Sequence, residues 1–164
     1  MAFPTGSIEF LTVAVEFCRF VEEADDCESA DFRVKLQKLL TLLYLKALMV
    51  DIPDFNPHED DEYDVNDFID EISYNSVRNA IHELMDEHDI YVALAAENDN
   101  SFDANTASFT VSEDVADVYQ SVGNFAYASK MGDEELMVEA LRRCIADFRF
   151  YWGARLLSCL TALH

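Results

Sequence analysis

The sequence has few of the residues that build turns. It contains four Gly and three Pro among 164 residues, which leaves little turn chemistry for a protein made of many β-strands. Its 51% hydrophobic content and twelve Phe still supply the apolar surface that a folded core requires. A disordered acidic tail is therefore excluded, and we expect one helical domain over residues 1–164.

Positive charge is scarce as well. Eleven Lys and Arg stand against 33 Asp and Glu, so the net charge is −22. Such a surface repels phosphate backbones and anionic lipid headgroups, so we expect neither a nucleic-acid partner nor a membrane partner. Most of the acidic surface is interpreted as a solvated face, and the partner that its charge favours is a basic protein.

Paired cysteines and long apolar runs are also missing. The four cysteines form no CxxC pair, and Cys18, Cys144 and Cys159 fall among apolar residues of expected helices, where a free thiol behaves as a small hydrophobe. The longest apolar run, residues 39–50, is interrupted by a Thr and a Lys and is too short to span a bilayer. No basic segment precedes the first apolar run, so no secretory signal is expected. A soluble, cytoplasmic protein fits this pattern best.

The apolar periodicity predicts an all-α bundle of about five helices. Ser7 is expected to cap the first helix, and Ser73 the third. The second half of the second helix is apolar around most of its circumference, so this helix is expected to be the most enclosed. Its first half carries a cationic patch, which is interpreted as pairing with acids on neighbouring elements, or else as a site for an anionic ligand. The first three helices are expected at residues 7–24, 30–49 and 74–87, and the patch consists of Arg33, Lys35 and Lys38.

The last third of the chain has the strongest helical pattern. Thr110 and Glu113 form a capping box for a fourth helix. Gly132 ends that helix, and Asp133 caps a fifth helix of about thirty residues. We expect that this helix can bend at Gly153, and that the missing side chain there lets another segment of backbone approach closely. Helical phasing predicts that Tyr119 and Trp152 are packed, whereas Asp117, Gln120 and Asn124 face water, and that Arg149 or Arg155 covers the indole of Trp152. Residues 90–95 are expected to be a short strand or extended segment, and residues 97–106 a polar loop.

The segment 51–71 contains ten acids, two Pro and no Lys or Arg, and we interpret it as a long acidic loop. Its acids at 60, 62, 64 and 71 have the first, third, fifth and twelfth positions of a calcium loop. Val65 nevertheless stands where the sharp turn needs Gly, so specific Ca²⁺ binding is not expected. The candidate partner-binding surface in this segment consists of Glu59, Asp60, Asp61, Glu62 and Asp64.

One group of residues has the composition of a metal site. His82 and Asp86 lie one turn apart on the third helix, with His88 just beyond, and two His with a carboxylate can bind zinc. The second His of the HExxH metalloprotease motif is absent, because Asp86 stands in its place. The alternative interpretation is a surface His paired with an acid. No catalytic residues and no cofactor are implied by any other motif.

Three stretches resemble a known family. They are LLYLKA at 42–47, SEDVADVYQ at 112–120, and YWGARLLSCLTALH at 151–164. Together they resemble the bacterial family called domain of unknown function 5063 over nearly the whole chain. The family motif SEDLADIYQ is matched here except for Val115 and Val118. The resemblance implies an all-helical single domain and brings no catalytic residues with it.

The sequence therefore favours a non-enzymatic helical module that binds another protein through its acidic surface. One form of this hypothesis is mimicry of DNA by the acidic surface. A metal-dependent hydrolase that uses His82, Asp86 and His88 is the enzyme alternative. A self-associating structural protein is the third hypothesis, with Phe148, Tyr151 and Trp152 as an exposed aromatic face.

Overall fold

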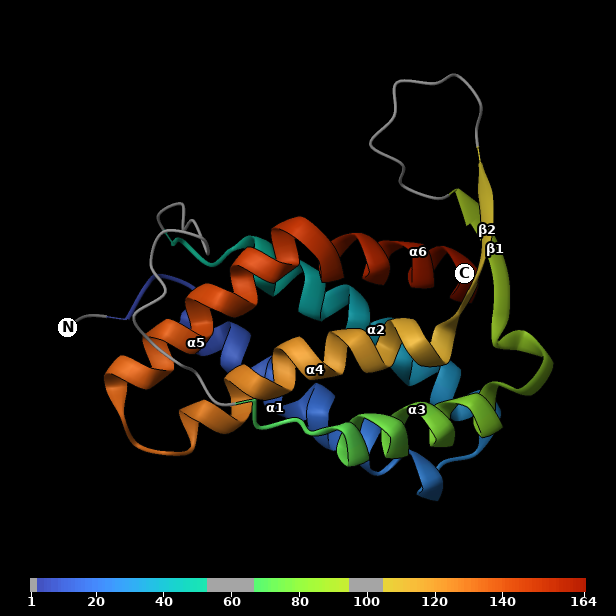
Figure 1. The fold of residues 1–164 in the computed structure, drawn as a ribbon, viewed down its shortest axis with the longest axis horizontal. Coiled ribbons are helices and arrows are strands. Elements are labelled where there is room, and N and C mark those ends of the chain that lie inside the picture. The colour runs from blue at the N-terminus through green and yellow to red at the C-terminus, as the bar shows by residue number, and fades with distance from the viewer. Residues whose placement is uncertain (1–2, 53–66, 95–104) are drawn as a thin grey trace.

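Helices packed around a central helix, α4, make up most of the chain, as Figure 1 shows. The computed structural model describes residues 3–52, 67–94 and 105–164. The helices are α1 (Ser7–Glu22), η1 (Ala24–Asp26), α2 (Ser29–Leu48), α3 (Glu71–Met85), η2 (Asp86–His88), α4 (Val111–Ser129), α5 (Glu134–Asp147), η3 (Phe148–Trp152) and α6 (Gly153–Leu163). The strands β1 (Ile90–Leu94) and β2 (Thr106–Thr110) form a hairpin at one end. The prediction of a mostly helical domain is confirmed.

The central position of α4 follows from its sequence. Most of its residues are buried, and it packs against α1, α3, α5 and α6. The Thr110 hydroxyl accepts a hydrogen bond from the Glu113 amide at 3.2 Å, which satisfies one of the free N–H groups of the first turn. The predicted cap of this helix is therefore confirmed. Tyr119, on its packed face, is buried as predicted.

The centre of the core is aromatic. Trp152 is fully buried, and its indole N–H donates to the Cys144 carbonyl at 2.9 Å. Phe10 of α1 stacks on Phe125 of α4, with ring centroids 5.6 Å apart, and lies 6.5 Å from the Trp152 ring. Aromatic pairs at this spacing stabilise the fold by more than the burial of their apolar surface alone. The first, fourth and last helical stretches are therefore joined here.

The expected Arg cover of this indole is wrong. The Arg155 guanidinium lies 4.0 Å from the centroid of Phe109 on β2, and Arg149 donates to the Ile52 carbonyl at 3.4 Å. Since Trp152 is enclosed by the core, no cation can reach its face from the surface.

The last helical stretch is continuous, as predicted, but its irregularity has a different cause. Five residues, η3, take a π-helical turn between α5 and α6, and the Gly153 amide donates to the Phe148 carbonyl. A Cβ at Gly153 would lie 2.5 Å from that carbonyl oxygen and 2.9 Å from the Phe148 ring. The close backbone expected at Gly153 therefore belongs to the same helix.

Two predicted caps are wrong. Ser7 is the first residue of α1 and the residue before it, Gly6, has a positive φ of 84°. A side chain at Gly6 would meet the Met49 carbonyl at 2.5 Å, so glycine is needed for this close approach. Asp70, rather than Ser73, caps α3 by accepting from the Ser73 amide at 2.8 Å. The helix therefore starts at Glu71, inside the expected acidic loop, of which residues 53–66 lie outside the described residues.

The extended segment predicted after α3 has a partner that the sequence did not indicate. β1 pairs antiparallel with β2, with Tyr91 opposite Phe109. The Val111 amide donates to the Asp89 carbonyl at 2.9 Å and ties the base of the hairpin to the start of α4. Tyr91 and Phe109 occupy the inner face. The outer face exposes Ile90, Val92 and Leu94.

The prediction that α2 is the most enclosed helix is wrong. Phe32, Leu36, Leu40, Leu43 and Ala47 are buried on one face, but several apolar side chains of α2 remain exposed. The cysteines agree with the prediction, because Cys18, Cys144 and Cys159 are buried free thiols. Within the three described ranges, no helix is both long enough and apolar enough to cross a membrane.

Candidate functional site

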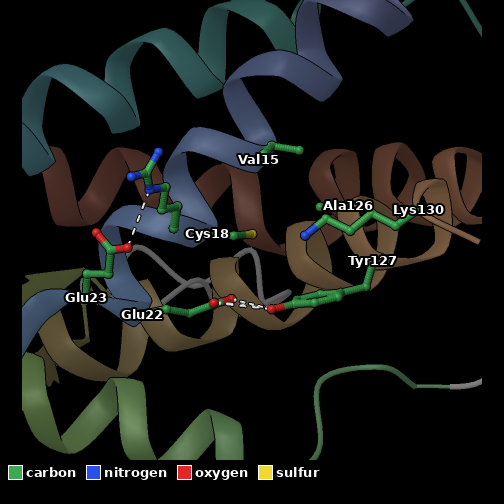
Figure 2. Close-up of a pocket in the computed structure, with 8 residues that line it drawn as sticks. Val15, Cys18, Glu22, Glu23, Ala126, Tyr127 and Lys130 are labelled. Atoms are coloured by element: carbon green, nitrogen blue, oxygen red, sulfur yellow. Dashed lines mark hydrogen bonds and ion pairs between the residues drawn. The ribbon is translucent and has the colours of Figure 1, made fainter.

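A hollow of about 310 Å³ lies between the end of α1 and the end of α4 (Figure 2). Its α1 wall includes Cys18, Glu22 and Glu23, and its α4 wall includes Tyr127 and Lys130. The two helices pack directly against each other, so the hollow is set by the fold rather than by a loop. It is open to solvent on one side, and Val15 and Ala126 supply apolar lining.

Glu22 is the central group of this site. Tyr127 donates to its carboxylate at 2.9 and 3.2 Å, and Tyr119 donates at 3.1 Å. Figure 2 shows the Glu22 and Tyr127 side chains pointing toward each other across the hollow. Two hydroxyls from α4 therefore fix a carboxylate of α1. Glu22 makes no ion pair among the described residues.

The two tyrosines stay protonated in this arrangement. Burial first, and the Glu22 hydrogen bond next, raise the pKa of Tyr127 to about 12. Burial and the Glu22 charge also raise the pKa of Tyr119. A phenol with a raised pKa remains a hydrogen-bond donor at neutral pH. Neutral hydroxyl donors therefore hold the Glu22 carboxylate in place, and no neighbouring cation neutralises its charge.

A second hollow of about 290 Å³ lies on the other side of Glu22 and Tyr127, against α3. Its lining includes Val21, Val77 and Ala80 from α1 and α3, together with the acid Asp25. Since the two hollows share Glu22 and Tyr127, they form one surface, which we call the Glu22 groove. It combines apolar walls with exposed carboxylates, a combination that accepts the aliphatic stem and charged end of a Lys or Arg side chain.

The cations near the groove do not neutralise Glu22. Lys130 lies over the Tyr127 ring, 4.6 Å from its centroid. Arg19 pairs with Glu23 at 3.4 Å, and both side chains are largely exposed, so this pair contributes little to stability. The Glu22 carboxylate is left available to a further donor.

The thiol that lines the groove is not activated as a nucleophile. Burial raises the pKa of the Cys18 thiol to about 12, so the thiolate that would react is not populated at neutral pH. Its remaining polar groups are carboxylates, phenols, the hydroxyls of Ser73 and Ser76, and two exposed cations. This chemistry suits recognition of a charged group rather than covalent catalysis.

The predicted metal residues are not brought together. His82 Nδ1 lies 2.7 Å from Asp89 Oδ2, and Asp89 is fully buried. His88 lies 3.8 Å from Glu87 instead. In the part of the chain that the structure describes, no group of three His, Cys, Asp or Glu side chains could hold a metal ion. His82 is thus a surface His paired with an acid, but the acid is Asp89 and not Asp86.

Asp89 is a structural residue. Its carboxylate accepts from the Ser112 amide and the Ser112 hydroxyl, each at 2.7 Å. It therefore joins the turn after α3 to the first turn of α4, and the bond to His82 extends this connection to α3. A buried carboxylate with three donors is well satisfied.

A second buried acid lies where the hairpin meets the helices. Asp114 accepts from the Tyr91 hydroxyl and lies 3.9 Å from Arg155 Nη1. The same hydroxyl lies 3.0 Å from Ser158 Oγ. Burial raises the pKa of Asp114 to about 6, against the lowering effects of Tyr91 and Arg155. This cluster attaches β1 to α4 and α6.

The polar row predicted on α4 only partly faces water. Gln120 is exposed as predicted, and Glu113 on the same face is exposed as well. Asp117 instead accepts from Tyr74 at 2.6 Å and from Tyr151 at 2.5 Å. Asn124 accepts from the Ile69 amide at 2.8 Å. Asp117 and Asn124 therefore connect α4 to other parts of the fold instead of facing water.

The proposed aromatic face for self-association is also wrong. Phe148 and Trp152 are buried, and Tyr151, although half exposed, is bound to Asp117. The exposed aromatic residue in this turn is Phe150. Helical phasing already predicted that Trp152 is packed, and Phe148 is buried with it, so these three residues do not form an exposed face.

The acids of the candidate loop surface, Glu59, Asp60, Asp61, Glu62 and Asp64, lie outside the described residues. Glu22 was not predicted, because its local pattern does not distinguish it from the neighbouring acids Glu23, Asp25 and Asp26. A signal was present: Tyr119 and Tyr127 lie eight residues apart, about two turns along one side of α4. The spacing of the two tyrosines does not show, however, that α1 packs on that side of α4.

The described features define a small, mostly helical protein of one domain. The chain belongs to the family described as Domain of unknown function (DUF5063), whose family model matches residues 2–164. The resemblance seen in the sequence is thus confirmed. The chain is similar to protein BF1032 from Bacteroides fragilis, known from a crystal structure, at 32% sequence identity and a TM-score of 0.78. The match covers 98% of this chain and 90% of that one. No curated protein matches the chain.

Proposed function

We propose that this protein is a non-enzymatic module that binds a protein partner, and that the Glu22 groove receives a basic segment of that partner. The observation that carries the proposal is the Glu22 carboxylate, exposed and fixed by two tyrosines without a cationic partner among the described residues. Preorganised carboxylates of this kind bind Lys and Arg without first paying the entropy of ordering the acid side chain.

The charge of the whole chain supports the same partner. A net charge of −22 attracts a basic protein over distances comparable with the Debye length, about 10 Å at 0.1 M salt. Association is therefore expected to be fast and sensitive to salt. We propose that the acids Glu59, Asp60, Asp61, Glu62 and Asp64 contribute to this attraction, and that the protein acts in the cytoplasm, where buried free thiols are stable.

The test is capture of a partner from native lysate at low and at high salt. The wild-type chain is compared with Glu22→Gln and with a matched control, Glu16→Gln. Glu16 is an exposed acid of α1 outside both hollows, so both variants lose the same charge. We expect to capture a partner at low salt but not at high salt. The amount captured should fall with Glu22→Gln and stay unchanged with Glu16→Gln.

A further variant tests the acidic segment, by replacing its five acids at 59, 60, 61, 62 and 64 with Gln or Asn. We expect slower association and a weaker salt dependence, because the long-range field is reduced. Unchanged binding would remove this segment from the proposal. Absence of any salt-sensitive partner would contradict the proposed function itself.

A further inference from the structure

The helix α2 has apolar residues on two opposite sides. Its core side is buried, as described above. On the other side, Val34, Leu42, Leu45, Leu48 and Met49 are between 41% and 58% exposed. At about 100° per residue, Leu45 points directly away from Leu36, which is fully buried. We call this exposed side the outer face of α2. Contiguous exposed apolar surface of this kind marks interaction sites in soluble proteins.

The outer face is shaped like a shallow groove. Its volume is about 420 Å³, and its lining is Val34, Gln37, Lys38, Thr41, Leu42 and Leu45, all from α2. These residues recur at spacings of three and four, which makes a ridge-and-groove surface along a single helix. An amphipathic helix with apolar residues at the same spacing is the element that fits it.

Two lysines beside the groove have no counterion among the residues that the structure describes. Lys35 and Lys38 are exposed and form no ion pair within the described ranges. Lys46, farther along the helix, pairs with Glu9 at 2.9 Å. The chain has 33 acids for eleven Lys and Arg. The positive charge beside this apolar groove is therefore opposite in sign to the net charge of the molecule. Within the described ranges, the predicted pairing of the cationic patch with neighbouring acids is therefore not seen for these two lysines.

We propose that the outer face of α2 binds an amphipathic helix of a partner protein, in which acidic residues flank the apolar stripe. The apolar stripe would cover Leu42 and Leu45, and the flanking carboxylates would pair with Lys35 and Lys38. A second copy of the chain fits less well, because each copy carries a net charge of −22 and the two copies repel each other. This face shares no lining residue with the Glu22 groove, so the proposal stands independently of the proposed function.

Binding of two synthetic peptides tests the proposal. Both are helices of about 18 residues with Leu at spacings of three and four. One carries Glu beside the Leu stripe, and the other carries Gln there. Fluorescence anisotropy with the full chain gives the two dissociation constants. Because the protein is strongly acidic, general electrostatics disfavour the Glu peptide, so tighter binding of the Glu peptide must come from local cations.

Three variants assign the binding to this face. Leu42→Gln with Leu45→Gln is expected to weaken the Glu peptide about tenfold or more. Lys35→Glu with Lys38→Glu is expected to reverse the preference, so that the Gln peptide binds more tightly. Leu94→Gln on the hairpin is the matched control, since Leu94 is also an exposed leucine, and is expected to change nothing. Circular dichroism checks that each variant is folded.

Equal binding of the two peptides to the wild-type chain, or no effect of the Leu42 and Leu45 changes, would overturn the proposal. Sedimentation of the wild-type chain tests whether a second copy of the chain covers this face instead. A dimer that dissociates in Leu42→Gln with Leu45→Gln would show that a second copy covers the face, and would also overturn it. A monomer that prefers the Glu peptide supports it.

Discussion

At the scale of single residues, tyrosine hydroxyls take the place that cations have in many proteins. Five of the six tyrosines that the structure describes donate to carboxylates, and the acids concerned are Glu22, Asp114 and Asp117. With three acids for each Lys or Arg, most acids cannot have a cation of their own. A hydrogen bond to a charged group contributes about 1.5–3 kcal/mol, so phenols are effective substitutes.

Asp114 is expected to make stability depend on pH. Its pKa is raised to about 6 in the folded protein, above the ordinary value of 3.8. The folded state therefore binds the proton more tightly, and this contribution to stability is lost as the pH rises from about 4 to 6. Relative to Asp114→Asn, the wild-type chain should gain up to about 3 kcal/mol between pH 7 and pH 4.

Denaturant unfolding of both proteins at several pH values measures this difference. Comparing the two chains removes the contribution of the other acids, which they share. A difference in unfolding free energy that stays constant between pH 4 and pH 7 would contradict the raised pKa of Asp114.

His82 is expected to titrate above its ordinary range. The hydrogen bond to Asp89, and then the charge of Asp89, raise its pKa above 6.5. The stabilisation from this pair is present in full below the unfolded pKa and is lost as the pH rises through the folded pKa. Proton NMR of the imidazole should give a raised pKa. The stability difference between wild-type and His82→Gln should shrink from pH 6 to pH 9, and an ordinary His82 pKa would refute the contact.

At the scale of elements, sequence pattern was most informative where structure is local. The Thr110 and Asp133 caps were predicted correctly, because the side chain and the amide that it accepts lie within three residues. The pairing of β1 with β2 was missed, because it depends on residues separated along the chain. The outer face of α2 was wrongly predicted to be buried, because apolar content does not say whether a second layer of protein covers it.

Candidate sites were predicted less well than helices. The Glu22 groove needs α1, α3 and α4 to meet, and no spacing within one helix encodes that meeting. The predicted metal group was missed for a similar reason: the His82 ring is bound to Asp89, which lies seven residues away and beyond the end of α3, and His88 lies beside Glu87.

The π-helical turn supplies a prediction about α5 and α6. Gly153→Ala should destabilise the protein by about 2–4 kcal/mol, because the new Cβ would press on the Phe148 carbonyl and on a packed ring. Helix propensity alone would favour Ala by about 1 kcal/mol. Gly132→Ala is the control: its φ is 77° and no atom lies within 4 Å of the new Cβ, so only a cost of about 1 kcal/mol is expected. Equal unfolding free energies for the two variants would contradict the tight turn.

At the scale of the whole molecule, charge and apolar surface are arranged on different sides. The Glu22 groove presents acids between α1, α3 and α4, whereas the outer face of α2 presents leucines and two lysines that form no ion pair with any described residue. Four of the eleven Lys and Arg lie on α2, with one Asp. A molecule with two chemically distinct surfaces is suited to bringing two proteins together.

The most direct measurement is the dissociation constant of the captured basic partner for wild-type, Glu22→Gln and Glu16→Gln at low and high salt. Truncating a preorganised charge contact should weaken binding about tenfold or more. The predicted result is that loss for Glu22→Gln at low salt, a smaller loss at high salt, and little change for Glu16→Gln. Equal weakening by both variants would show that only net charge matters, and would contradict the Glu22 groove as the binding site.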